Sequence, residues 1–229
     1  VTVYLLTEKV APVQEAFYFV NDSMTRDGRY LWFYCAYPPS GSSGHGRTLG
    51  VVDFEKDTVR QFPETQFNAP YVDTETGEAY WGMGPSIWRR GPGKDDAVEL
   101  VNSLPEDLVN NRTISRLATH LTLSADGKEF FVDSAFGLQW VMGSLSVDGS
   151  DYQLWQRFDR NYNHAQFSPT DPDLALFAEE NHSDPITGLR FKIVDRMWLI
   201  RRGEVARPVY DTPTRVTHEW WDPDGEHVW

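Results

Sequence analysis

Five copies of one short pattern run through the chain, and they constrain its fold more than any other feature. They begin at Asn21, Asn68, His120, His164 and His218, so successive starts are 47, 52, 44 and 54 residues apart. In each of the three histidine copies, four positions separate the histidine from the Ser or Asp that opens a turn. A repeat of this length is typical of β-propeller blades, in which each blade is a four-stranded sheet.

Each copy has the pattern of a hairpin, and a second hairpin follows it before the next copy begins. Asp and Gly fill most of the turns, and both residues tolerate the positive φ angles that tight hairpin turns require. The sequence therefore predicts an all-β fold, a β-propeller of four-stranded blades with about four and a half blades present. We expect residues 1–229 to form a single β-propeller domain that is incomplete at its C-terminus, as a fragment of a seven-bladed ring. Only residues 105–111 could form a helical turn.

The starting residues of the five copies are the first candidate site. In a propeller the innermost strands begin around one mouth of the central channel, so these polar residues should form an arc on one face. His45 and His182 lie in connections that should face the same side. Imidazole can serve as a base, an acid or a metal ligand. The alternative is architectural, because repeated histidines can instead bond the backbone of a neighbouring blade.

Composition removes several classes of function. With a net charge of −13, the chain is not expected to bind nucleic acid or an anionic membrane surface. It has no apolar stretch long enough for membrane insertion. There is no phosphate-binding loop, cysteine-based zinc site or nucleophile elbow, and Cys35 reads as an inert buried thiol. A glycosidase with paired carboxylates stays open, because 34 acidic residues offer no way to choose a pair.

Arginine and tryptophan side chains could complete a sugar site. Arginine holds a carboxylate through two parallel hydrogen bonds, so one or two arginines at the mouth would bind an acidic sugar. Arg201 and Arg215 are the candidates, although most arginines of this region, Arg196 and Arg202 included, are expected to be solvated. The tryptophans are expected mainly in blade cores.

Three segments carry a resemblance to a known group of proteins. They are NHAQFSPTDP, THEWWDPDGEHVW and FYFVNDSMTRDGRYLWF. The chain resembles carbohydrate-active seven-bladed propellers of gut bacteria, namely α-L-rhamnosidases that remove rhamnose from glucuronic acid in arabinogalactan, and the related ulvan lyases. More distantly it is similar to oligogalacturonate lyases, which bind a divalent metal with His and Gln. The resemblance implies an acidic oligo- or polysaccharide substrate and a periplasmic or secreted bacterial protein. No cofactor is assigned, but a divalent cation is a candidate.

Three functions follow from this resemblance. The first is hydrolysis of rhamnose linked to glucuronic acid, with His45 as general acid or base. The second is a polysaccharide lyase that cleaves uronic-acid glycans by β-elimination. Its site would use His120, His164, His218, Tyr162 and His182. The third is a propeller that binds glycans without catalysis and whose histidines are structural.

Overall fold

The regular secondary structure of the chain is almost entirely β. The computed structural model describes residues 8–37, 47–66 and 68–229. Helix α1 (Glu106–Val109) is a single turn, inside the segment where the sequence predicted one. The predicted all-β class is therefore confirmed. No helix among the described residues is long and apolar enough to cross a membrane.

Four antiparallel sheets of four strands each make up most of the fold, as the repeat predicted. In each sheet, neighbouring strands follow one another along the chain, apart from one insertion. The first sheet contains β1 (Val13–Glu15), β2 (Tyr30–Ala36), β3 (Thr48–Asp53) and β4 (Thr58–Phe62). The second contains β5 (Asn68–Val72), β6 (Ala79–Met83), β7 (Ser86–Arg90) and β8 (Glu99–Ser103). The third contains β9 (Thr122–Leu123), β10 (Glu129–Phe136), β11 (Gln139–Ser146) and β12 (Tyr152–Phe158).

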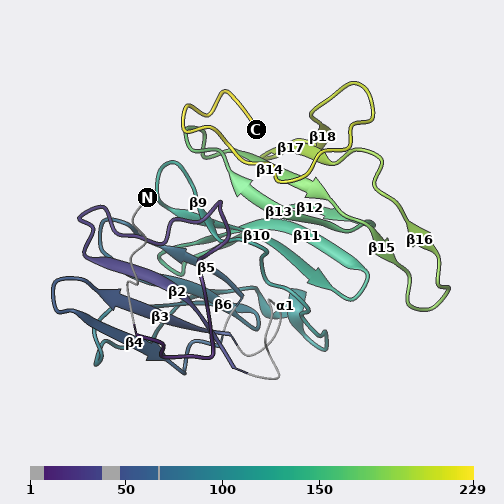
Figure 1. The fold of residues 1–229 in the computed structure, drawn as a ribbon. Coiled ribbons are helices and arrows are strands. Elements are labelled where there is room, and N and C mark those ends of the chain that lie inside the picture. Colours follow the sequence, from purple (N-terminus) through teal and green to yellow (C-terminus); the bar gives the residue numbers. More distant parts are fainter. Residues whose placement is uncertain (1–7, 38–46, 67) are drawn as a thin grey trace. The chain divides into compact units, whose positions relative to one another are not determined.

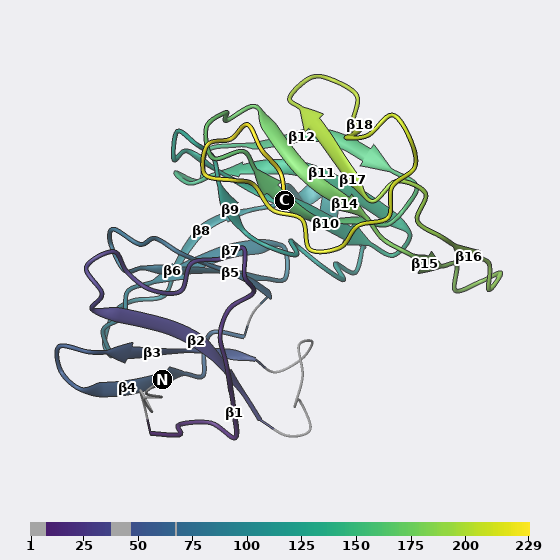
Figure 2. The ribbon, with the colours of Figure 1, turned by 45° about the horizontal axis from the view of Figure 1, so that its top comes forward.

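The fourth sheet carries the insertion. Its strands are β13 (Tyr162–Phe167), β14 (Leu174–Glu179), β17 (Met197–Arg201) and β18 (Arg207–Pro208). Between β14 and β17 the chain forms a separate two-stranded sheet from β15 (His182–Ser183) and β16 (Arg190–Phe191). Figures 1 and 2 both show β15 and β16 as a narrow hairpin that extends away from the strands of the fourth sheet.

The chain divides into two compact units. Strands β1 to β6 belong to one unit and β9 to β18 to the other, while β7 and β8 contribute residues to both. In the first unit the core contains Trp32, Leu49 and Trp81, all fully buried. Cys35 is also buried, and its burial raises the pKa of the thiol to about 12, as expected for an inert side chain. A buried thiol of this pKa stays protonated and is a poor nucleophile.

The second unit has an aromatic core between its third and fourth sheets. Phe131 of β10 contacts Phe167 of β13, with ring centroids 5.0 Å apart, and Phe177 of β14 packs in the same cluster. Strands β10 and β14 are almost wholly buried because both of their faces are covered. β14 is accordingly an almost continuous apolar run, whereas β10 also buries the polar side chains of Asp133 and Ser134. Two of the predicted histidines lie next to this core, His120 two residues before β9 and His164 within β13.

The fifth copy of the repeat begins a further hairpin. Trp221 and Val228 form an antiparallel bridge, and the backbones of Trp220 and Trp229 exchange two hydrogen bonds, of 3.0 and 2.9 Å. The side chain of Trp221 donates to the carbonyl oxygen of Gln166 in β13 at 3.3 Å. The predicted start of another blade at His218 is therefore confirmed.

Candidate functional site

A recurring hydrogen bond places the five copies in register. In each copy the N–H of the residue that opens the turn donates to the carbonyl oxygen that closes it. The pairs are Thr25 with Tyr30, Asp73 with Glu78, Ser124 with Glu129, Ser168 with Leu174 and Asp222 with His227. Counting back four residues gives the equivalent starting positions Asn21, Ala69, His120, His164 and His218. The prediction that Asn68 occupies this position is therefore wrong by one residue.

A β-bulge explains the shift of one residue. β5 and β13 each contain one extra residue relative to the strand that they pair with. The bulged residues Ala69 and His164 have positive φ angles of 57° and 55°, and His218 has a φ of 63°. A bulge re-aims the side chain that it contains and breaks the alternation of faces along the strand. The bulge, and not the regular pleat of β13, therefore sets the direction of the His164 side chain.

The structure brings His120 and His164 together, as the repeat predicted. His120 Nε2 lies 3.4 Å from His164 Nδ1, and the two rings meet edge to face with centroids 5.2 Å apart. His120 is buried, with 6% of its surface exposed, whereas 20% of the His164 side chain is exposed. His164 is therefore the member of the pair that solvent or a ligand can reach.

Burial keeps both imidazoles neutral. It lowers the pKa of His120 to about 3, with smaller contributions from His164 and from the positive charge of Arg116. Burial also lowers the pKa of His164, against the opposing effect of the carboxylate of Glu219. Desolvation disfavours the charged form of a histidine, so both rings are unprotonated at neutral pH. A neutral imidazole can accept a proton or ligate a metal, but it cannot form an ion pair with an anion.

A buried carboxylate holds the backbone around this pair. Asp133 of β10, 1% exposed, accepts hydrogen bonds from the backbone N–H and the hydroxyl of Thr119, the residue before His120. It also accepts from the N–H of Ala165, the residue after His164, at 3.4 Å. Arg116 donates to the carbonyl oxygen of Asp133 at 3.0 Å. One side chain therefore positions the backbone next to both histidines.

A buried ion pair also lies beside His164. Both oxygens of the Glu219 carboxylate accept from Arg196, with two distances of 3.2 Å, and Arg196 also bonds the carboxylate of Glu180. Glu219 Oε1 lies 3.9 Å from His164 Nδ1. Gln166 donates to the carbonyl oxygen of Glu219 at 2.9 Å and so fixes its backbone to β13. A negative charge is thus held beside His164, where it would stabilise the protonated imidazole.

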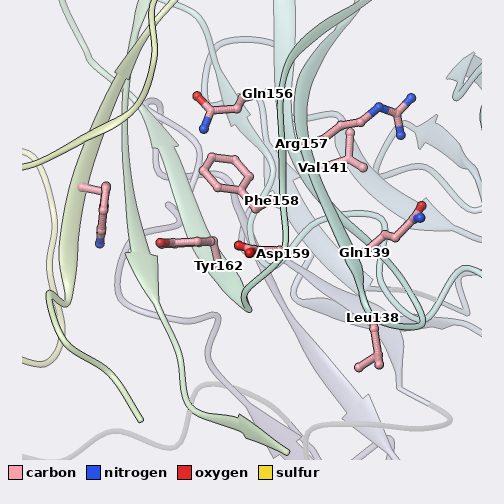
Figure 3. A pocket seen from close by; sticks show the side chains of 9 residues that line it. Leu138, Gln139, Val141, Gln156, Arg157, Phe158, Asp159 and Tyr162 are labelled. Atoms are coloured by element: carbon pink, nitrogen blue, oxygen red, sulfur yellow. The ribbon is translucent and has the colours of Figure 1, made fainter. Parts of the chain in front are cut away.

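Tyr162 lines a cavity of about 690 Å³ between the third and fourth sheets. In Figure 3, Phe158, Asp159 and Tyr162 lie close together among the side chains that line this cavity. The Tyr162 ring is nevertheless a core group, because it packs against Phe158 with centroids 4.6 Å apart and burial raises its pKa to about 12. Its predicted part in substrate binding would be limited to the edge that faces the cavity.

The other two predicted histidines have different surroundings. His182 stacks on Phe191 with ring centroids 4.6 Å apart, and its ring lies 4.9 Å from that of Trp140. These contacts support a structural role for His182 at the base of the β15–β16 hairpin. His218 is exposed and directly precedes the buried Glu219. It therefore lies next along the chain to the His164 site and remains open to solvent.

The two predicted arginines lie at opposite ends of the fourth sheet. Arg201 is the partner of Leu174 in the β14–β17 pairing, at the turn end, and forms an ion pair of 2.8 Å with Asp171. The structure therefore does not bring Arg201 to His164, which lies toward the other end of β13. Arg215 lies three residues before His218 and lines a second cavity. His45 is outside the described residues.

Sequence reasoning missed the parts of the site that are charged and buried. The sequence predicted a solvated Arg196, and this prediction is wrong, because Arg196 is only 6% exposed. Glu219 is 2% exposed. The one available signal was Glu219 itself, an acidic residue inside a strand-like aromatic run. Among the described residues, no group of three or more His, Cys, Asp or Glu side chains is arranged to hold a metal ion.

The lowered pKa of His120 predicts a loss of stability in mild acid. The unfolded histidine has a pKa of about 6.5, and the folded value is about 3. Between these two pKa values the unfolded chain binds a proton that the folded chain excludes. The contribution of the neutral His120 to the free energy of unfolding is therefore present above about pH 6.5 and is lost as the pH falls. At pH 5 this histidine alone should lower the free energy of unfolding by about 2 kcal/mol relative to pH 8.

Urea unfolding at pH 8 and pH 5 measures this effect in the native protein and in His120→Gln. The substitution removes the titrating group, so the variant should lose about 2 kcal/mol less than the native protein between the two pH values. Equal losses in the two proteins would show that His120 does not titrate as its burial implies.

Comparison with known proteins shows the fold. No protein-family model matches the chain, and no curated protein matches its sequence. An oligogalacturonate lyase in complex with manganese matches with a TM-score of 0.71 and 15% identity, over 94% of this chain and 58% of that chain. An oligogalacturonate lyase from Vibrio parahaemolyticus matches with a TM-score of 0.70 and 14% identity, over 97% of this chain and 60% of that chain.

TolB from Acinetobacter baumannii matches more weakly, with a TM-score of 0.53 and 14% identity, over 90% of this chain and 46% of that chain. These matches and the four-stranded sheets confirm the predicted β-propeller fold, and the structural resemblance to oligogalacturonate lyases is confirmed with them. The chain spans 58% and 60% of the lengths of the two lyase structures. At these identities the likeness extends to fold and not to activity.

Proposed function

We propose that this chain is part of a polysaccharide lyase that cleaves a uronic-acid glycan by β-elimination. The observation that carries the proposal is the neutral His120–His164 pair, whose exposed member lies beside a buried carboxylate. The fold adds support, because solved structures that this chain resembles include oligogalacturonate lyases. The proposal concerns the whole protein, because this chain spans only 58% and 60% of the lengths of the two lyase structures.

His164 is the proposed base. If its Nδ1–H donates to His120 Nε2, its Nε2 lone pair is left for the substrate, and the low pKa of His120 suits an acceptor that stays neutral. His164 would take the ring proton next to the uronate carboxylate. The electron pair of that C–H bond forms a C=C bond as the neighbouring C–O bond breaks. Glu219, 3.9 Å away, would stabilise the resulting imidazolium, and the departing oxygen takes a proton, for which the exposed His218 is the candidate donor.

Manganese is present in one of the lyase structures that match, but the described residues of this chain do not complete a metal site. They bring two imidazoles together, and the nearest carboxylate, that of Glu219, is already bound by Arg196 on both oxygens. Arginine in this geometry competes with a cation for the same lone pairs. We therefore assign no step to a metal.

Ultraviolet absorbance tests the reaction, because elimination creates a conjugated double bond and hydrolysis does not. The full-length protein, incubated with oligogalacturonate, should show rising absorbance. His164→Gln should lower the rate by about 10²- to 10⁴-fold, the usual contribution of a positioned base. His227→Gln is the matched control, because the His227 side chain is exposed and forms a hydrogen bond with Asp224 in the nearby turn. Its rate should stay at that of the native protein.

Other outcomes point to the other two functions predicted from the sequence. A flat absorbance trace with oligogalacturonate and with ulvan contradicts the lyase proposal. Free rhamnose from gum arabic would then indicate the hydrolase, for which the predicted residue is His45. Binding of glycan without turnover would indicate a non-catalytic propeller.

A further inference from the structure

Three cationic side chains surround the second cavity of the fourth sheet. This cavity has a volume of about 340 Å³, within the range of about 300–1,000 Å³ that small-molecule sites occupy. It is lined by Asn181, Arg190, Lys192, Ile193 and Arg215. The residues come from the link between β14 and β15, from β16 and the segment after it, and from the connection that leads to His218. Segments that are distant in sequence therefore bring positive charge to one place.

The alternation of faces along β16 explains why two of these cations share the cavity. Phe191 stacks on His182, with ring planes only 9° apart, and this contact fixes its face of the strand. In an extended segment, residues on either side of Phe191 point the opposite way. Arg190 and Lys192 therefore face the cavity together. Asn181 accepts the N–H of Ile193 on its Oδ1 at 3.1 Å, which leaves its NH₂ group as a donor.

The charge of these residues is not balanced within the described part of the chain. No carboxylate there forms an ion pair with Arg190, Lys192 or Arg215, although the chain has 34 acidic and only 21 basic residues. Two buried carboxylates of the same region are bound to other arginines, since Glu179 pairs with Arg160 and Glu219 with Arg196. All three side chains are exposed, so water screens their mutual repulsion, and an anion in the cavity would gain charge-assisted hydrogen bonds from them.

We infer that this cavity binds the carboxylate of a uronic acid residue of the glycan, an assignment that rests on the proposed function. The two arginines offer planar forks that match a carboxylate, Lys192 adds a point charge, and the Asn181 amide suits a sugar hydroxyl. Hydrogen bonds also link the wall of this cavity to the histidine site. Arg196 donates its backbone N–H to Thr214, the residue before Arg215, at 3.3 Å, and its side chain holds Glu219 beside His164.

Calorimetry with two matched ligands tests this inference on the full-length protein. The ligands are trigalacturonate and its fully methyl-esterified form, which keeps the sugar chain but lacks the charges. The native protein should bind trigalacturonate more tightly than the ester. The triple variant Arg190→Gln, Lys192→Gln, Arg215→Gln should bind trigalacturonate about tenfold or more weakly, because it loses charge-assisted hydrogen bonds.

The control variant Lys128→Gln, Arg201→Gln, Arg207→Gln changes the net charge equally at exposed positions away from the cavity, and it should bind as the native protein does. Equal affinity of the triple variant and the native protein overturns the inference. So does equal affinity for the two ligands, or no binding by the native protein. The absorbance assay separates the two proposals. Charge-dependent binding without elimination rejects the lyase and keeps the cavity, whereas elimination with an unchanged KM in the triple variant rejects the cavity and keeps the lyase.

Discussion

Arg196→Met should lower the free energy of unfolding by about 3–5 kcal/mol, the usual cost of removing one partner of a buried ion pair. The substitution keeps much of the side-chain volume but leaves the Glu219 carboxylate buried without its two hydrogen bonds from the guanidinium. It also removes the donor to the backbone of Glu179. Urea unfolding followed by tryptophan fluorescence measures the loss.

Two further variants show whether the loss comes from the ion pair. Arg201→Met breaks an exposed pair in the same sheet, with Asp171, and should change stability by less than about 1 kcal/mol. Adding Glu219→Leu to Arg196→Met removes the stranded charge and should recover a substantial part of the loss. If the double variant is no more stable than Arg196→Met, the cost lies in packing and the account of a stranded carboxylate is wrong.

Asp133→Ala should be nearly as costly, with an expected loss of about 3 kcal/mol or more. The carboxylate accepts hydrogen bonds from Thr119 and from the buried N–H of Ala165, and an alanine leaves these donors without a partner. Each buried donor that loses its partner costs about 1–3 kcal/mol. The same substitution should also reduce activity, because it releases the backbone next to both His120 and His164.

Thermal unfolding and the absorbance assay measure the two effects. Asp211→Ala is the control, since this aspartate is exposed in the connection before His218 and should leave both properties unchanged. Asp133→Asn keeps an acceptor of the same size and should fall between the alanine variant and the native protein. An Asp133→Ala protein of native stability would contradict the assigned role of these hydrogen bonds.

The repeat could be predicted from the sequence because its turns have a recognisable amino-acid composition. Asp-Gly pairs mark hairpin turns wherever they occur, and four-stranded blades follow from the spacing of those turns. Turn chemistry does not fix the exact start of each copy, because the start depends on how the backbone of its first strand pairs. The predicted second start, Asn68, is wrong by one residue because the bulge in β5 gives that position to Ala69. A bulge depends on the pairing with the next strand, which a single sequence does not reveal.

The site could be predicted only in part, for a different reason. Histidines at equivalent repeat positions indicated that His120 and His164 would meet, since equivalent strand ends in neighbouring blades lie close together. Burial of charge leaves no comparable pattern, because Arg196 and Arg201 look alike in the sequence. Tertiary packing separates them, with one inside against Glu219 and the other at the exposed turn end.

The left-handed backbone at His164 and His218 means that stability and the proposed lyase activity make opposite demands on these two positions. Outside glycine, this conformation costs of order 1–2 kcal/mol, and glycine, or to a lesser extent asparagine, would relax it. Selection for a more stable protein would therefore favour losing the imidazole at residue 164, and selection for catalysis would favour keeping it. A library screened for heat resistance alone should thus become enriched in inactive proteins, with the change concentrated at the bulge of β13.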